Sequence, residues 1–298
     1  MAFNTTLTLP NEILVAYSRK AYLEALPYFV FRNFVDEKTE LQQEPGKTIQ
    51  FLKLNNIASG SFLDEFTPVP TQQLSDSVVT LTVYPCGNAV ELTEELTRFS
   101  WRDVVSDASV RLGRNYVEFV DNYLRDTFLN TGNIQYAGGA ANDGAITSAN
   151  KFKTDEIKDA VQFMKTLNIS PLNRNGDIHY VCIIDPKQAR DMRDDTAWIS
   201  AHKYTDPNAM YVGEIGRYEN VIFIETTQMP TTTGTGSGNI DIHSAIMIGA
   251  NAVGYAESLP MELRQDPPSD LARKTKFGWY AILGAGIIND YLLEIRTA

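Results

Sequence analysis

Three histidines and two cysteines are the residues of this chain best suited to metal binding or nucleophilic chemistry. His179, His202 and His243 lie far apart, and no two of them have the i, i+4 spacing that presents two imidazoles on one helix face. Cys86 and Cys182 each lie inside an apolar, strand-like run, and two cysteines supply neither a disulfide framework nor a multi-cysteine zinc site. We therefore expect structural histidines, buried or half-buried thiols in a reducing compartment, no metal and no cofactor.

Two glycine-rich stretches resemble enzyme motifs. Gly284-Ala285-Gly286 follows a strand-like run, as a dinucleotide fingerprint does, but the few residues after Gly286 leave no room for a βαβ unit. The stretch 234–238 has Gly236 where a nucleophile elbow requires serine. We expect a tight glycine region at 284–286 and a flexible surface loop at 234–238.

Charged clusters are diluted by the opposite sign. Arg190 and Arg193 are interleaved with Asp191, Asp194 and Asp195, which predicts a solvated, salt-bridged helix face. A basic cluster near the C-terminus is interrupted by Asp266 and Asp270 and is too thin to predict nucleic-acid recognition; its members are Arg264, Arg273, Lys274 and Lys276. No set of residues favours catalysis over a structural role, so we predict no catalytic residues, although a triad assembled in space leaves no trace in spacing.

The composition is that of a globular protein with a real core. The chain has 298 residues, is 43% hydrophobic and 21% charged, and carries a formal net charge of −11. These values exclude global disorder, collagen and coiled coil, and the acidic balance argues against a protein that grips phosphate backbones. The N-terminus lacks the charged and apolar regions of a signal peptide, and the most apolar run, 280–288, is far shorter than the ~20 residues that span a bilayer. We expect a soluble protein, made in a cytoplasm, with no membrane partner.

The first ninety residues cannot bury their own apolar side chains. A short helical patch at 13–17 and an acidic stretch at 36–40 form an arm, and β runs at 47–54 and 77–84 form an extended hairpin. Three apolar residues in the hairpin connection have no local core to enter: Phe62, Leu63 and Phe66. An isolated hairpin is marginal in water, so these side chains are expected to contact a neighbouring subunit.

The rest of the chain has clear periodicity. Ser100 and Asp103 predict a capping box for the longest helix, which should run to about residue 130, and the glycine-rich stretch 131–150 predicts a mobile loop or linker. Thr154 is expected to cap a second helix, whose inward positions would be Ile157, Ala160, Val161, Met164 and Leu167. Asp185 and Pro186 start a third helix. Buried strands are expected at 180–184, 221–224 and 245–248, and further runs follow at 261–264, 278–283 and 291–295.

An arm and a hairpin attached to two compact regions predict an obligate assembly, in which neighbours supply the missing core. This order of elements resembles the major capsid proteins of tailed bacteriophages, with the Hong Kong 97-like fold. Four stretches further resemble the capsid proteins of N4-like phages: 180–186, 198–204, 213–217 leading into 221–226, and Gly278-Trp279.

The resemblance implies an α+β fold in five parts. They are an N-terminal arm (1–45), an extended hairpin loop (46–91), a peripheral domain with a spine helix (92–150), an axial domain (151–256) and return strands to the peripheral domain (257–298).

The resemblance also implies function and partners. The chain would be a structural protein, not an enzyme, forming pentamers and hexamers of an icosahedral virion shell around double-stranded DNA in the host cytoplasm. Portal, scaffolding and decoration proteins are the other partners it implies. Some members of this fold form a covalent lysine-to-asparagine bond between subunits through the hairpin. Because no Lys occurs from Leu54 to Arg98, we do not expect that chemistry here.

Two alternatives remain open at the level of sequence. An encapsulin-type compartment has the same fold and would enclose enzymes, and an α/β enzyme could be centred on residues 151–256. Size separates them, because an enzyme elutes as a small oligomer and a shell protein as pentamers, hexamers or particles.

Overall fold

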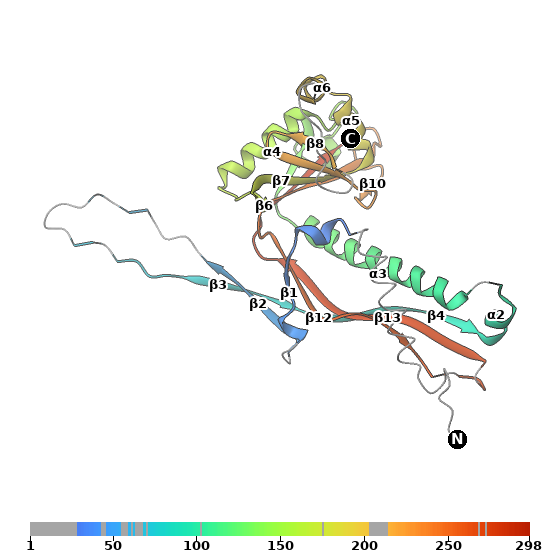
Figure 1. Ribbon diagram of the computed structural model, residues 1–298. Helices are drawn as coiled ribbons and strands as arrows, with labels where there is room; N and C mark the ends of the chain where they lie inside the picture. The colour runs from blue at the N-terminus through green and yellow to red at the C-terminus, as the bar shows by residue number, and fades with distance from the viewer. Residues whose placement is uncertain are drawn as a thin grey trace.

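The computed structural model describes residues 29–42, 46–54, 59–60, 62, 68–69, 71–101, 103–174, 176–202, 214–267, 269–271 and 273–298. An eight-stranded sheet with its helices lies above one end of an elongated platform, and a hairpin projects away from the platform (Figure 1). The helical patch expected at 13–17 lies outside the described residues.

The platform is a four-stranded sheet in the order β1-β12-β13-β4. The short β1 (Asp36–Lys38) runs parallel to β12 (Val253–Gln265), and β12 pairs antiparallel with β13 (Lys274–Ile287), which pairs antiparallel with β4 (Tyr84–Thr93). The expectation of a tight region at 284–286 is wrong, because β13 continues through both glycines and keeps its register with β12. The reason for glycine at these positions is a close approach by the hairpin, described below.

One face of the platform is covered by the spine helix α3 (Val104–Leu129), which confirms the predicted long helix. Its buried side chains follow the helical period and include Leu112, Tyr116, Val120, Leu124 and Phe128, which share a core with Trp279 of β13.

The predicted capping box at the start of this helix is only half right. Asp103 caps α3 by accepting N–H bonds from Val105 and Ser106, at 3.1 and 3.2 Å. Ser100 instead ends a short preceding helix, α2 (Glu94–Phe99), where its N–H donates to the Leu96 carbonyl. Because α2 ends only a few residues before α3 begins, Ser100 belongs to the end of α2 and Asp103 alone caps α3.

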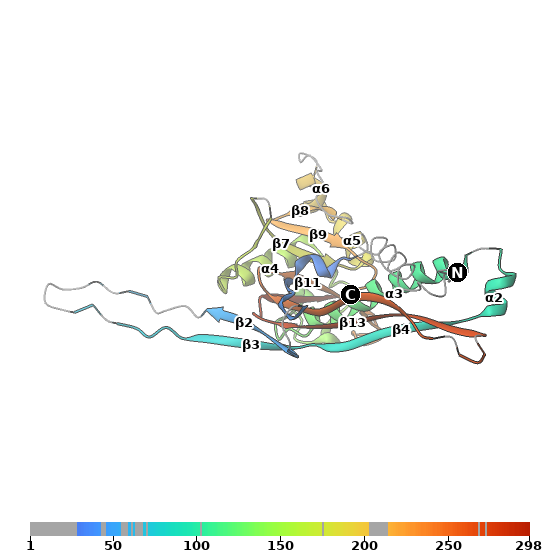
Figure 2. The ribbon, with the colours of Figure 1, turned by 60° about the horizontal axis from the view of Figure 1, so that its bottom comes forward.

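The hairpin is formed by β2 (Thr48–Leu54) and β3 (Asp76–Thr82), which pair antiparallel over seven residues each. Both predicted β runs are therefore confirmed. Figure 2 shows the hairpin extending from one end of the platform, while α2 lies at the opposite end.

The larger sheet has the order β5-β14-β11-β7-β9-β8. Its strands are β5 (Ile134–Tyr136), β14 (Leu292–Thr297), β11 (Ile242–Ile248), β7 (Asp177–Ile184), β9 (Val221–Glu225) and β8 (Glu214–Tyr218), with β6 (Leu172–Arg174) on β7 and β10 (Thr231–Thr232) on β11. Strands β7, β9 and β11 are buried on both faces, which is why they read as continuous apolar runs.

Helices cover one face of this sheet: α4 (Thr154–Thr166), α5 (Pro186–Arg193) and α6 (Thr196–His202). The other face joins the core beneath the spine helix, so one apolar core connects the sheet with the platform. The expected starts of α4 and α5 are confirmed within a residue. Leu167 is not an inward residue, since it is 50% exposed just beyond the end of α4.

The stretch 131–150 is not a mobile linker. It contains β5 and the 3-10 turns η4 (Ala137–Gly139) and η5 (Asp143–Ala145), and Ala137 and Ile146 are fully buried. Arg296 of β14 forms an ion pair with Asp143 at 2.7 Å, and Asn150 Nδ2 donates to the Ala137 carbonyl at 3.0 Å. A partner on β14 and hydrogen bonds within the segment together order it.

The C-terminal strands divide between the two sheets. β12 and β13 belong to the platform, whereas β14 pairs with β11 and β5 in the larger sheet. Two 3-10 turns, η2 (Phe31–Phe34) and η3 (Glu40–Gln42), bring the end of the arm onto the platform.

No helix among the described segments is long and apolar enough to cross a membrane.

Candidate assembly surfaces

The histidines and cysteines considered for metal binding or nucleophilic chemistry are mostly buried in the fold. His243 is buried, with Nδ1 2.8 Å from an Asp185 carboxylate oxygen, and His179 is buried on β7, while His202 has no described side chain. Burial raises the pKa of the half-buried Cys86 thiol to about 11 and also raises the pKa of the buried Cys182 thiol, so both are poor nucleophiles. Across the described ranges, no group of three His, Cys, Asp or Glu residues is placed to hold a metal ion.

The acidic cluster near α5 is not simply a solvated face. Asp191 is buried and lies 3.3 Å from Lys151 Nζ. Asp195 accepts the N–H of Thr154 at 2.9 Å, its hydroxyl at 2.6 Å, and the N–H of Ala197 at 3.1 Å. The expectation is wrong for these two residues, because Asp191 ties α5 to the segment before α4 and Asp195 joins the starts of α4 and α6. Asp194 is exposed, as expected of a solvated face.

The hairpin base is part of the subunit core. Ile49, Phe51, Leu81 and Val83 form a buried cluster with Ile288 and Ala256. Tertiary contacts therefore stabilise the paired part of a hairpin that would be marginal alone.

Beyond its base the hairpin is apolar, acidic and exposed. Phe62 is fully exposed, whereas Leu63 and Phe66 lie outside the described residues. Further exposed apolar side chains on the hairpin are Leu52, Val69, Leu74 and Val78. The chain from 55 to 97 holds only acidic residues among its charges, with no Lys or Arg. Exposed apolar side chains gathered on a projecting hairpin are typical of a surface that a partner covers.

A second exposed apolar surface lies at the opposite end of the platform, and we call it the tip. It consists of α2, the residues just after it, and the turn between β12 and β13. Its large apolar side chains are almost fully exposed: Phe99 at 81%, Trp101 at 92% and Leu271 at 94%. Aromatic residues of this kind dominate the energetics of protein interfaces.

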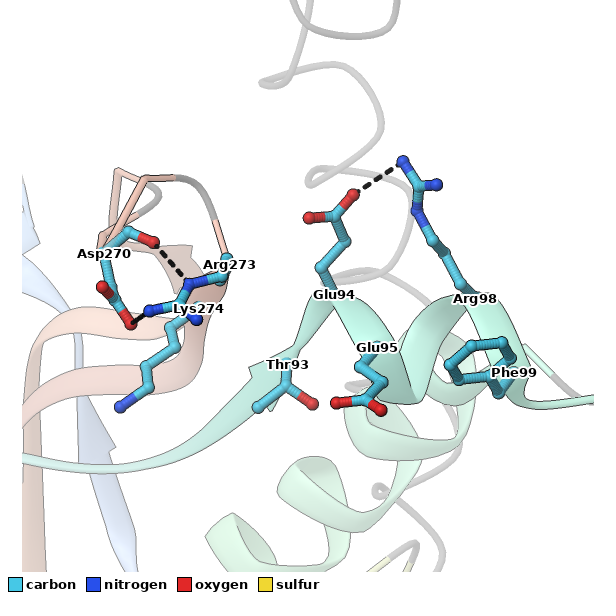
Figure 3. Close-up of a pocket in the computed structure, with 8 residues that line it drawn as sticks. All are labelled: Thr93, Glu94, Glu95, Arg98, Phe99, Asp270, Arg273 and Lys274. Atoms are coloured by element: carbon cyan, nitrogen blue, oxygen red, sulfur yellow. Dashed lines mark hydrogen bonds and ion pairs between the residues drawn. The ribbon is translucent and has the colours of Figure 1, made fainter.

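The tip also contains an open pocket of about 430 Å³, shown in Figure 3. Two ion pairs lie on its sides, Glu94 with Arg98 at 2.7 Å and Asp270 with Arg273 at 2.8 Å. Glu95 and Lys274 complete its charged lining, which balances three acids against three bases. Such a surface carries no net charge to repel a copy of itself.

The tip was missed at the level of sequence. Phe99 and Trp101 precede a strongly periodic helix, so they read as part of its start. One signal in the sequence could have revealed the tip. The large apolar residues ahead of the helix, Leu96, Phe99 and Trp101, do not continue the apolar stripe of α3 that begins at Ala108, so the core of that helix does not account for them.

The arm is fastened to the spine helix by a buried charged network. Both oxygens of Asp121 accept backbone N–H bonds from the arm, and Arg32 is held 3.1 Å from Glu257 of β12 and 2.7 Å from Glu37. The guanidinium carbon of Arg32 lies 5.2 Å from the centroids of both the Phe29 and Tyr255 rings. The end of the arm is thus an integral part of the platform.

A platform with exposed apolar surfaces at both ends and a fixed arm has the features of a subunit that packs against other chains in a shell. The chain belongs to the phage capsid protein family, whose family model matches residues 76–292. It is a structural major capsid protein with a Hong Kong 97-like fold that forms the virion shell, and it is not an enzyme.

Solved capsid structures share this fold at low sequence identity. The capsid of Ralstonia phage GP4 is 16% identical, with a TM-score of 0.75 over 88% of this chain and 86% of that chain. The capsid of cyanophage Pam1 is 17% identical, with a TM-score of 0.75 over 89% and 88%. The head of Helicobacter pylori bacteriophage KHP40 is 16% identical, with a TM-score of 0.64 over 88% and 86%. No curated protein sequence matches the chain, and the resemblance to N4-like phages stays a prediction.

Proposed function

We propose that this capsid protein forms pentamers and hexamers of an icosahedral shell that encloses double-stranded DNA, and that assembly takes place in the cytoplasm of a bacterial host. The observation that carries the proposal is the exposure of large apolar side chains toward two opposite ends of one platform. A monomer in water would leave both surfaces solvated, whereas neighbouring copies bury them.

The hairpin is proposed as one inter-subunit contact, made through Phe62, Leu63 and Phe66. Support comes from the exposed Phe62 and from the buried base, which holds the strands in a fixed direction before any neighbour arrives. A preformed strand pair loses less conformational entropy on docking than a free loop does.

The tip is proposed as the second contact, with the pocket edge packing on another copy. Its balanced charges support a copy as the partner, because Glu94, Arg98, Asp270 and Arg273 are exposed enough to exchange their present ion pairs for pairs across an interface. Exposed pairs contribute about 0 to 1 kcal/mol each, so such an exchange costs little.

The proposed domains follow the expected boundaries, apart from three strands that the strand pairing assigns to another part. Residues 1–45 form the arm, 46–91 the hairpin loop with the start of β4, 92–150 the spine region and 151–256 the axial domain. The platform receives β12 from residue 253 onward, and the axial sheet receives β5 (Ile134–Tyr136) and β14 (Leu292–Thr297).

The cargo is proposed from the family and from charge. A formal net charge of −11 suits a container that repels DNA weakly and does not hold it by sequence. Portal, scaffolding and decoration proteins would be separate chains.

Nuclease protection tests the cargo. Particles purified from infected cells are treated with DNase before the shell is opened with detergent and protease. We expect protected, genome-length double-stranded DNA. Particles that protect no DNA and contain a co-purifying enzyme would instead identify an encapsulin-type compartment.

A further inference from the structure

The hairpin base crosses the platform over three glycines, Gly254 on β12 and Gly284 and Gly286 on β13, which we call the glycine saddle. Gly254 and Gly286 are directly opposite each other in the antiparallel pair, and Gly284 lies two residues from Gly286 on the same face of β13. The saddle is therefore one continuous patch without side chains.

The hairpin touches this patch too closely for any side chain to fit between them. A Cβ atom at Gly284 would lie well under 3.0 Å from the backbone carbonyl oxygen of Thr82, and one at Gly286 equally close to Cδ2 of Leu81. A Cβ atom at Gly254 would lie 2.9 Å from the ring of Phe51 and 2.8 Å from Ile288. Both hairpin strands thus rest on the saddle, β2 through Phe51 and β3 through Leu81 and Thr82.

The contact lies at the point where the hairpin joins the platform. β3 ends at Thr82 and β4 begins at Tyr84, with the Val83 N–H donating to the Lys47 carbonyl at 3.0 Å. Phe51 and Leu81 are buried there, in one cluster with Ile288 and Ala256, so the hairpin base is packed directly on the platform.

We propose that the glycine saddle positions the hairpin, setting the direction in which it leaves the subunit and therefore whether it reaches its contact on a neighbour. This inference rests on the proposed inter-subunit role of the hairpin. The paired strands span about 23 Å at ~3.3 Å per residue, so a lift of about 1 Å at the seat moves the far end by a few ångströms. Packed interfaces tolerate little misplacement of this kind, because they reach the density of protein interiors.

The test places one methyl group at a time in the full-length chain. Gly284→Ala and Gly286→Ala are compared with Gly132→Ala, where the new Cβ would lie 3.8 Å from Asp290, and with Gly60→Ala on the hairpin itself, where no atom lies within 4 Å. Shell yield by sedimentation and electron microscopy is measured beside the thermal melt of the unassembled subunit. We expect both saddle variants to lower the shell yield at least 10-fold while the two controls assemble as wild type.

A compensating change separates positioning from folding. Leu81→Ala removes the atom that a methyl group at 286 would strike, so Gly286→Ala with Leu81→Ala should recover shells relative to Gly286→Ala alone. The same Leu81→Ala change should not rescue Gly284→Ala, because the obstacle there is the Thr82 backbone. Leu81→Ala alone gives the cost of the lost packing.

Two results would overturn the inference. One is wild-type shell yield from Gly284→Ala and Gly286→Ala subunits. The other is a Gly286→Ala, Leu81→Ala subunit that recovers the wild-type melt and still forms no shells while Leu81→Ala alone does. Failure of the wild-type chain to form rings or shells, both alone and when expressed with the other structural proteins of its phage, would contradict the proposed function instead, so the two failures are distinguishable.

Discussion

A buried carboxylate oxygen of Asp121, in the middle of the spine helix, accepts the backbone N–H of Val30 at 2.9 Å. The other oxygen accepts the N–H of Phe31 at 3.1 Å, so one side chain satisfies two donors at the start of η2. This contact holds the segment that brings Phe29 and Phe34 into the core beside Phe31. Burial raises the pKa of Asp121 to about 6, although the N–H bonds from the arm oppose the shift.

The Asp121 pKa predicts a specific pH dependence of stability. The folded pKa lies above the unfolded value of 3.8, so the native state binds this proton more tightly, and Asp121 adds stability as the pH falls from about 6 to about 4. The gain is at most about 3 kcal/mol, from about two pKa units at 1.36 kcal/mol each. Asp121→Asn should remove this increment. It is measured as the difference between variant and wild type in urea unfolding of the unassembled subunit at pH 4.5 and pH 7.

Asp126→Asn is the matched control for that experiment, since Asp126 is exposed on the same helix. It should keep the wild-type pH dependence. Parallel pH profiles for Asp121→Asn and wild type would show that Asp121 does not titrate in this window.

Removing Arg32 should destabilise the subunit strongly. Arg32→Ala leaves Glu257 buried without its cation, and breaking a buried pair in this way costs about 3 to 5 kcal/mol. Arg98→Ala, which breaks only the exposed pair with Glu94, should cost less than about 1 kcal/mol. Urea unfolding measures both, and equal costs would mean that the arm is not anchored through Arg32.

Charging the tip should block assembly without unfolding the subunit. Trp101→Asp combined with Leu271→Asp places two charges where the proposed interface is apolar, and both positions are exposed in the single subunit. We expect an unchanged thermal melt and loss of closed shells by sedimentation. Leu167→Asp, at a half-exposed leucine just beyond α4, serves as the control and should assemble. Normal shells from the doubly charged tip would remove the tip from the assembly account.

Truncating the hairpin should separate folding from assembly in the same way. Replacing residues 60–70 by a short Gly-Ser turn leaves the buried base at Ile49, Phe51 and Leu81 in place, so cooperative unfolding should persist. Closed shells should disappear, because the proposed contacts of Phe62, Leu63 and Phe66 are gone. A truncated subunit that no longer unfolds cooperatively would show that the hairpin end belongs to the core.

Elements whose pattern is set by their own residues could be predicted from the sequence. The stripe of the spine helix and the continuous apolar runs of β7, β9 and β11 arise from local periodicity and burial on both faces. The hairpin strands followed from alternation, whereas a partner for Phe62 and its neighbours stays a prediction.

Features that depend on distant partners could not be predicted. The order of 131–150 depends on Arg296 and β14, and the glycines of β13 are explained by Thr82 and Leu81, about two hundred residues earlier in the chain. In the sequence Asp121 is one more polar residue on a helix. Its role becomes visible only when the arm, 90 residues earlier in the chain, is seen to lie against it.

Assembly of the purified full-length protein tests the central claim most directly. The chain is expressed alone and with the other structural proteins of its phage, and the product is examined by negative-stain electron microscopy and analytical ultracentrifugation. The account predicts pentamers and hexamers of the lone chain and closed icosahedral shells of uniform size in one or both preparations. A monodisperse dimer or tetramer in both preparations, with no rings or shells at any concentration, would contradict it.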